Sequence, residues 1–158
     1  MTPATALAIR EGELDDPAVI ALLRVHAEGM LAASPPGSCH FLDLSGLKQP
    51  EVRFFSAWIG DRLAGIGALK RLDAGHGELK SMRVAEAFLG QGVGRAMLEH
   101  LIATARAMGM TQLSLETGST APFAPALAMY AAHGFEPCGA FGDYRDGDPF
   151  SRFLTRAI

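Results

Sequence analysis

The chain has 158 residues, of which 49% are hydrophobic and 20% are charged, and its formal net charge is −3. This size and balance fit one globular domain with a substantial core, and we expect a single domain over residues 1–158. The slightly acidic charge, with arginines scattered along the chain, excludes a broad nucleic-acid-binding surface and predicts no nucleic-acid partner.

The ends and the cysteines bear on cellular location. Residues 1–10 lack the basic start and long apolar core of a secretory signal. No apolar run is long enough to span a bilayer, so no membrane partner is expected. Cys39 and Cys138 are far apart and lack metal-ligand spacing. We therefore expect a cytoplasmic protein with reduced thiols, no disulfide and no metal.

The first half of the chain combines short strands with one long helix. Residues 5–10 favour a strand, and Asp16 followed by Pro17 indicates a helix start, with a carboxylate cap and a proline at the first helical position. Apolar side chains then recur on one helical face until the Pro- and Gly-rich segment 34–38 ends the helix. The next expected elements are a short helix at 43–48 and strands over 52–59 and 63–72.

The following strand, over 78–84, departs from the two-residue period of a strand. Its first two apolar positions, Leu79 and Met82, are three residues apart. One extra residue near Lys80-Ser81 would restore a common face, which predicts a β-bulge that splays the neighbouring strands. Partial burial of both faces explains the pattern equally well from the sequence alone.

A glycine-rich turn at 89–94, Leu-Gly-Gln-Gly-Val-Gly, opens an amphipathic helix over 92–108. The glycines let the backbone approach a ligand closely, and the first N–H groups of a helix have no intrahelical partner. With the helix dipole they form a site for an anion such as a pyrophosphate. A glycine turn alone also fits a simple tight turn or the site of a different nucleotide.

Alternation over 112–117 predicts a strand whose leucines face inward while Ser114 and Glu116 face outward. A helix is expected over 123–133. The remaining expected elements are a short strand at 135–138, a loop rich in Gly and Asp over 139–149 and a last strand over 150–157. The mixed order of strands and helices predicts a mixed α/β (α+β) fold with helices on both faces of the sheet.

Three segments together resemble the Gcn5-related N-acetyltransferase (GNAT) superfamily. They are the bulged strand 78–84, the turn 89–94 at the family's pyrophosphate loop, and 128–135, which is similar to the family's Leu-Tyr-x-x-x-Gly-Phe segment. The resemblance implies a mostly antiparallel sheet of six to seven strands, splayed by the bulge, with about four helices. Two positions depart from the pattern: Leu89 stands where the family has Arg or Gln, and Phe123 where it often has Asn.

The resemblance also implies a function. We expect transfer of an acetyl group from acetyl-CoA, as co-substrate, to a primary amine of a small molecule by direct attack in a ternary complex. A protein N-terminal or lysine acetyltransferase and a CoA-binding module without catalysis are the alternatives, and homodimerisation is left open. The residues expected to bind the cofactor are Met82, Arg83, Val84, Leu89, Gly90, Gln91, Gly92, Val93, Gly94, Arg95, Phe123 and Tyr130.

Catalytic candidates follow from the protons that this reaction moves. An alkyl amine, with a pKa of about 10.4, must lose a proton before it attacks, and the departing thiolate benefits from gaining one. Tyr130 remains protonated at pH 7 and is the expected donor. Glu78 and Glu116 are the expected bases, acting directly or through water, although some family members use a water chain alone.

The acceptor site in the family forms from the first helix, its following loop and the last hairpin. Here that implies residues 30–41 and 141–153. Arg145 is a candidate for holding a substrate carboxylate and Asp148 for holding a cation. Both segments are rich in Pro, Gly, Phe and Tyr, which favours a small, partly apolar substrate over a basic protein tail.

Overall fold

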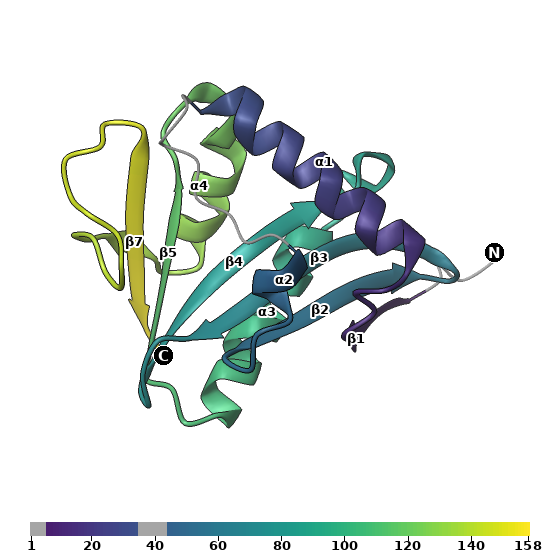
Figure 1. Cartoon of the computed structure of the whole chain (residues 1–158), viewed down its shortest axis with the longest axis horizontal. Helices are drawn as coiled ribbons and strands as arrows, with labels where there is room; N and C mark the ends of the chain where they lie inside the picture. The colour runs from purple at the N-terminus through teal and green to yellow at the C-terminus, as the bar shows by residue number, and fades with distance from the viewer. Residues whose placement is uncertain (1–5, 35–43) are drawn as a thin grey trace.

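The computed structural model describes residues 6–34 and 44–158, which form one seven-stranded sheet with helices on both faces (Figure 1). The strand order is β1-β2-β3-β4-β5-β7-β6, and only the β4–β5 pair is parallel, so the predicted mixed, mostly antiparallel sheet is confirmed. The strands are β1 (Leu7–Glu11), β2 (Val52–Ile59), β3 (Arg62–Arg71), β4 (His76–Val84), β5 (Gln112–Gly118), β6 (Glu136–Pro137) and β7 (Ser151–Ala157). The helices are α1 (Pro17–Ala33), α2 (Leu44–Leu47), α3 (Val93–Ala107) and α4 (Ala124–Ala132), with single 3₁₀ turns η1 (Glu86–Phe88) and η2 (Ala121–Phe123).

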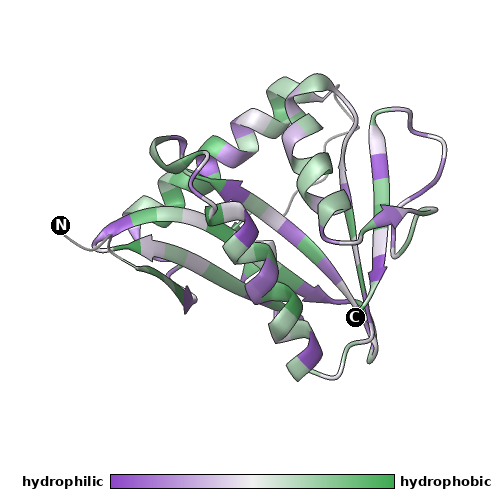
Figure 2. Ribbon diagram, turned by 180° about the vertical axis from the view of Figure 1, so that it is seen from behind, coloured by the Kyte–Doolittle hydropathy of each residue, from purple (hydrophilic) through white to green (hydrophobic). Residues whose placement is uncertain are grey.

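Two apolar clusters hold the helices to the sheet. Helices α1 and α2 lie on one face, and α3 and α4 lie on the other, which Figure 2 shows from behind. Polar and apolar residues alternate along α3 in that view, as expected of a helix with one side against a sheet. The cluster under α1 and α2 contains Val19, Leu22, Leu47, Phe54, Trp58, Ile66 and Ala68. The larger cluster under α3 and α4 includes Met97, Leu98, Leu101, Ile102, Leu113, Leu115, Tyr130 and Phe135.

Helix α1 begins where the sequence predicts. The Asp16 carboxylate accepts a hydrogen bond from the backbone N–H of Ala18 at 2.8 Å, and Pro17 occupies the first helical position. Such a cap is worth about 1 kcal/mol of helix stability. Val19, Leu22, His26 and Met30 are buried against the sheet, so the predicted apolar face fixes how α1 crosses β3 and β4.

The predicted β-bulge in β4 is confirmed. Ala68 of β3 pairs with Lys80 and Ile66 pairs with Arg83, so two steps along β3 match three along β4. Ser81, the first of the two residues between Lys80 and Arg83, has a φ of 55°, a left-handed conformation that is uncommon for a residue other than glycine. The bulge turns the second half of β4 away from the line of β5.

The expectation that Ser114 faces solvent is wrong. Its side chain is buried, and its hydroxyl lies 2.6 Å from His76 Nε2 and 2.9 Å from Thr155 Oγ1. Glu116, which shares this face, is also largely buried. The reason lies in the loop after β6: Phe141 packs against the ring of His76, and Phe141, Tyr144 and Phe153 contact one another over this part of the sheet.

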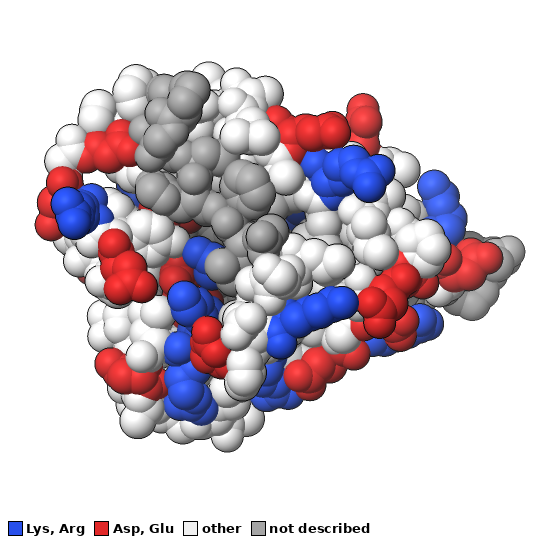
Figure 3. All heavy atoms as spheres, in the orientation of Figure 1, with Lys and Arg blue, Asp and Glu red and all other residues white. Residues whose placement is uncertain are grey.

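Figure 3 shows how charged residues are distributed over one face of the molecule. On the face shown in Figure 3, acidic and basic side chains are interspersed rather than grouped by sign. Among the described helices, none has the length and apolar character to cross a bilayer. Within residues 6–34 and 44–158, no group of three or more His, Cys, Asp or Glu side chains could hold a metal ion. Cys138 is a free thiol, and Cys39 lies outside the described residues.

Candidate active site

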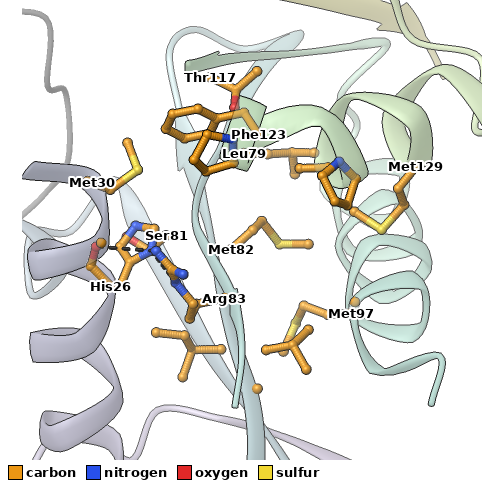
Figure 4. A pocket seen from close by; sticks show the side chains of 18 of the residues that line it. His26, Met30, Leu79, Ser81, Met82, Arg83, Met97, Thr117, Phe123 and Met129 are labelled. Atoms are coloured by element: carbon orange, nitrogen blue, oxygen red, sulfur yellow. Dashed lines mark hydrogen bonds between the residues drawn. The ribbon is translucent and has the colours of Figure 1, made fainter. Parts of the chain in front are cut away.

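A cavity of about 860 Å³ opens where β4 and β5 part (Figure 4). The two strands pair from His76 with Gln112 as far as Leu79 with Leu115. Beyond that point β4 continues along β3 and β5 continues along β7, so the second half of β4 has no strand on its β5 side. Side chains from α1, α3 and α4 complete the walls of the cavity. The splayed strands therefore offer a backbone edge to anything that enters.

The turn before α3 presents a row of free backbone donors. Gly90 and Gly92 have φ values of 76° and 81°, in the left-handed region that glycine adopts without strain. Helix α3 begins at Val93 with no side-chain cap, and the Gly92 carbonyl already accepts from Ala96. Among the described residues, no acceptor receives a hydrogen bond from the N–H groups of residues 91–95. This helix start has the geometry of an anion site.

The side chains of this turn contribute less than its backbone. Leu89 is 62% exposed and can offer no hydrogen bond to a ligand. The Arg95 Nε donates to Glu99 Oε1 at 3.0 Å on the surface of α3, so the guanidinium lies along the helix. The donors for an anion are therefore supplied by the main chain.

Tyr130 of α4 lies in the wall of the cavity. Its side chain is buried, and its ring packs edge-on against Phe135 with centroids 5.8 Å apart. Within the described part of the chain, its hydroxyl makes no hydrogen bond. Burial raises the pKa of Tyr130 well above its usual value of 10, so the hydroxyl keeps its proton throughout the physiological range.

Glu116 also lines the cavity, one residue beyond the last pair of β5 with β4. Its Oε1 is buried and has no hydrogen-bond partner among the described residues. Burial raises the pKa of this carboxyl to about 7, with the nearby Ser151 hydroxyl and the Lys80 ammonium opposing the rise and Glu78 and Asp148 adding to it. A carboxyl with a pKa near 7 is suited to accept a proton at neutral pH.

Glu78, the other candidate base, is only 3% exposed and does not line the cavity. Its Oε2 accepts hydrogen bonds from the Tyr144 hydroxyl at 2.6 Å and from Lys80 Nζ at 3.2 Å. Lys80 Nζ also donates to the Tyr144 oxygen at 2.8 Å, which closes a buried triad. The triad joins β4 to the loop after β6, so Glu78 has partners that Glu116 lacks.

Comparison with known proteins decides the family. Residues 20–135 match the family described as "Acetyltransferase (GNAT) family". The chain belongs to the GNAT acetyltransferase family. It is 50% identical over 150 residues to the uncharacterized N-acetyltransferase YedL of Escherichia coli (strain K12), a match that covers 95% of this chain and 94% of that protein.

Solved GNAT structures share the fold. A crystal structure described as an acyl-CoA N-acyltransferase from Klebsiella pneumoniae superposes with a TM-score of 0.81 at 27% identity, covering 97% of this chain and 98% of the other. A GNAT acetyltransferase from Elizabethkingia anophelis, solved with acetyl-CoA bound, gives a TM-score of 0.68 at 21% identity, covering 96% and 98%.

The predicted site residues gather around the GNAT cavity with one exception. Of the expected cofactor residues, eight line the cavity: Met82, Arg83, Val84, Leu89, Val93, Gly94, Phe123 and Tyr130. Gly90, Gln91, Gly92 and Arg95 belong to the turn that carries the free N–H groups. Phe123 packs its ring on the backbone of Gly118, where a Cβ atom would collide with it. The catalytic candidates Tyr130 and Glu116 line the cavity, whereas Glu78 lies behind it.

The sequence predicts a contribution of the first helix to the acceptor site only from Met30 onward, and it misses the preceding turn of α1. Met30 lines the cavity as expected, and His26 and Gly29 line it as well. Gly29 was the available signal, because an unbroken helix with an interior glycine usually has a packing or functional reason for it. Arg145, proposed from the sequence as an acceptor contact, is exposed and away from the cavity wall, and residues 35–41 lie outside the described part of the chain.

Proposed function

We propose that this GNAT protein transfers the acetyl group of acetyl-CoA to a primary amine of a small molecule by direct attack in a ternary complex. The observation that carries the proposal is the row of free N–H groups at residues 91–95 beside the open edge of β4. Both lead into a cavity whose walls hold a protonated tyrosine and a carboxyl with a pKa near 7. The acetyl-CoA bound to the Elizabethkingia anophelis relative supports the choice of co-substrate.

The backbone supplies what coenzyme A needs. The diphosphate would accept hydrogen bonds from the N–H groups of residues 91–95, with the dipole of α3 favouring its charge. The two amides of the pantetheine arm would pair with the unpartnered edge of β4 around Met82 and Val84, as an added strand pairs with a sheet. Phe123, where the family often has Asn, would contact the arm through its ring.

The proton movements assign roles to two side chains. Glu116 accepts a proton from the substrate ammonium, directly or through one water, and leaves a neutral amine. The amine nitrogen forms a bond to the acetyl carbon as the bond from that carbon to sulfur breaks. Tyr130 donates its proton to the departing thiolate, which leaves as the free thiol of coenzyme A. The attacking nitrogen loses its second proton as the amide forms, and this proton returns through water to the Tyr130 oxygen, while Glu116 releases the first proton to solvent. The products are the N-acetylated amine and coenzyme A.

Glu116 is a better base than Glu78 on three counts. It lines the cavity, one of its oxygens has no partner among the described residues, and its pKa lies near the working pH. Both hydrogen bonds to Glu78 come from groups of the buried triad, Tyr144 and Lys80. Glu78 is then a positioning residue, which fixes Lys80 and the loop after β6 beside Glu116.

The function is tested by Tyr130→Phe in an assay of thiol release from acetyl-CoA with a panel of primary amines. We expect kcat to fall about 100-fold, the usual cost of losing a general acid. The affinity for CoA, measured by calorimetry, and the melting temperature should stay close to those of the wild type, because the hydroxyl makes no hydrogen bond within the described structure. Equal turnover of the two proteins would remove Tyr130 from the mechanism. Tight CoA binding without turnover of any amine or peptide by the wild type would overturn the enzymatic proposal.

A further inference from the structure

Arg83 is a cation inside the cavity without a matching anion. It follows the bulge of β4, is half-buried and lines the cavity. Among the described residues, no carboxylate lies within ion-pair distance of its guanidinium. Figure 4 shows its side chain directed toward α1 and away from Met97 of α3. It therefore lies apart from the N–H groups that would hold the diphosphate.

Helix α1 holds the guanidinium of Arg83 in place. The Arg83 Nε donates to His26 Nδ1 at 3.2 Å, and one Nη donates to the His26 carbonyl oxygen at 3.4 Å (Figure 4). Burial, with the nearby Arg83 charge, lowers the pKa of His26 to about 4, so the imidazole is neutral and serves as an acceptor. Two of the five guanidinium N–H groups are thus used, and three remain without a partner in the described structure.

Two neighbours of Arg83 in the cavity wall, Gly29 and Ser81, bear on the position of its guanidinium. A Cβ atom at Gly29 would lie 2.6 Å from a terminal nitrogen of Arg83, so only glycine leaves the guanidinium its place. Glycine in a helix interior costs about 1 kcal/mol relative to alanine, which makes its use here informative. The Ser81 hydroxyl, on the same strand and also in the cavity wall, is buried without a hydrogen-bond partner among the described residues.

We propose that Arg83 binds a carboxylate of the acceptor, so that the substrate is an amino acid or a similar molecule with both an amine and a carboxylate. The inference rests on the proposed function and narrows its substrate class. Three free N–H groups at the end of a guanidinium can hold a carboxylate through two parallel hydrogen bonds. Glu116, in the cavity wall on β5, would then receive the amine end.

The rest of the cavity indicates the kind of amino acid. Helix α1, which holds Arg83, adds the apolar side chains of Val25, Met30 and Ala33 to the cavity wall, so an apolar side chain would be favoured. Two cations, Lys80 and Arg83, are among the described residues that line the cavity. Lys80 Nζ already donates to Glu78 and Tyr144, so Arg83 is left to hold one carboxylate. Arg145 lies on the exposed loop after β6, and the proposed binding of the carboxylate does not require it.

The test compares amines that differ only in the carboxylate. L-Leucine is paired with isoamylamine, L-phenylalanine with 2-phenylethylamine and β-alanine with ethylamine, in the thiol-release assay with acetyl-CoA. We expect kcat/KM to favour at least one carboxylated member by tenfold or more, the usual effect of a charged hydrogen bond. In Arg83→Gln, KM for that amino acid should rise at least tenfold with a smaller change in kcat, and the preference should disappear. Arg83→Lys should restore part of it.

Gly29→Ala gives a second variant that keeps the charge. It should displace the guanidinium and raise KM for the amino acid several-fold, while the higher helix propensity of alanine preserves the fold. If Arg83 only ties α1 to β4, its variants would lower stability and slow both members of a pair equally. That result, or a wild type that treats both members of every pair alike, would overturn the inference and leave the acetyltransferase proposal standing.

Calorimetry separates this inference from the proposed function. CoA-saturated wild type and Arg83→Gln are each titrated with the same amino acids and amines, with no need for turnover. If no amine is acetylated but L-leucine or another carboxylated member binds only when Arg83 is present, the reaction is wrong and the carboxylate site stands. Equal binding of both members of each pair, or binding of neither, counts against the site whatever the assay reports.

Discussion

The two sides of the cavity differ in the groups they present: one presents mainly backbone and the other mainly polar side chains. The cofactor side, where we propose that coenzyme A binds, is mainly backbone: free N–H groups at residues 91–95 and the open edge of β4. The side proposed to bind the acceptor consists of partly buried polar side chains, Arg83 and Glu116, with the triad around Glu78 behind Glu116. The difference suggests that the cofactor side tolerates changes of side chain as long as φ and ψ are kept. The acceptor side, in contrast, depends on individual functional groups and their charges.

The sharpest test of the acceptor side is Glu116→Gln. The pKa of Glu116 near 7 predicts that kcat/KM rises with pH through about 7, because only the carboxylate accepts a proton. The amide keeps the shape and removes the base, so kcat/KM should fall about 100-fold at pH 8 and the dependence near pH 7 should vanish. Steady-state rates from pH 5.5 to 9 measure both effects.

The matched control is Glu78→Gln, which changes a carboxylate one residue from the end of the paired strands. We expect a loss below tenfold with the pH dependence near 7 retained, because Glu78 acts by holding Lys80 and Tyr144. The opposite pattern, in which only Glu78→Gln removes the pH dependence, would transfer the role of base to Glu78.

The cofactor side is tested by two substitutions at Gly92. A Cβ atom at Gly92 would have no other atom within 4 Å, so the positive φ of 81° is the feature of this position that disfavours a side chain. Asparagine adopts the left-handed region readily and should bind CoA nearly as well as the wild type. Valine costs about 1–2 kcal/mol or more in that region, so the turn should shift and the Kd for CoA should rise at least tenfold. Equal weakening by both residues would show that the absence of a side chain, rather than the backbone angle, matters.

The same difference explains what the sequence could predict. The glycine turn, the bulge and the cap at Asp16 are local signals, since each depends on residues within a few positions of one another. They predict the fold and the cofactor side, and the described structure has the turn, the bulge and the cap where they were expected. The mostly antiparallel sheet of six to seven strands also follows once the family resemblance is added.

The acceptor side depends on contacts between distant segments. Ser114 and Glu116 alternate with leucines as exposed residues would, and only the aromatic residues of the loop after β6 reveal that this face is covered. The partner of Arg83 is His26, 57 residues away, and Tyr144 reaches Glu78 across 66 residues. No local pattern reports such distances, so the arrangement of charges in the cavity could not be predicted.

A third prediction concerns how the carboxyl of Glu116 lowers the stability of the folded protein. The pKa of Glu116 rises from 4.5 to about 7 on folding, so the folded state binds the proton more tightly than the unfolded state. Stability therefore falls as the pH rises from about 4.5 to about 7 and stays low above that range. Glu116→Gln should be more stable than the wild type by about 1 kcal/mol at pH 8, after allowance for partial solvation of the carboxylate, with little difference at pH 5. Urea unfolding at the two pH values measures this, and a variant less stable at pH 8 would contradict it.

The smallest expected effect concerns CoA binding at the first turn of α3. Charge is the side-chain property there that should change the Kd. Arg95 is exposed, and its bond to Glu99 is a surface pair of little energetic weight. Arg95→Gln should therefore change the Kd for CoA by less than twofold. Arg95→Glu places a negative charge in the first turn of α3, where it favours the helix dipole but repels a diphosphate, and should raise the Kd about two- to fivefold.

Arg106→Glu is the control for Arg95→Glu, since it makes the same change of charge in the last turn of α3. Arg106→Glu should destabilise α3 slightly and leave CoA binding unchanged. Arg95→Glu should stabilise α3 slightly and weaken CoA binding. The effect at Arg95 should also shrink as salt is raised toward 1 M, because screening weakens exposed charges. A large loss of binding in Arg95→Gln would mean that the guanidinium itself holds the phosphate. The cofactor side would then depend on a side chain as the acceptor side does, and the contrast between them would fail.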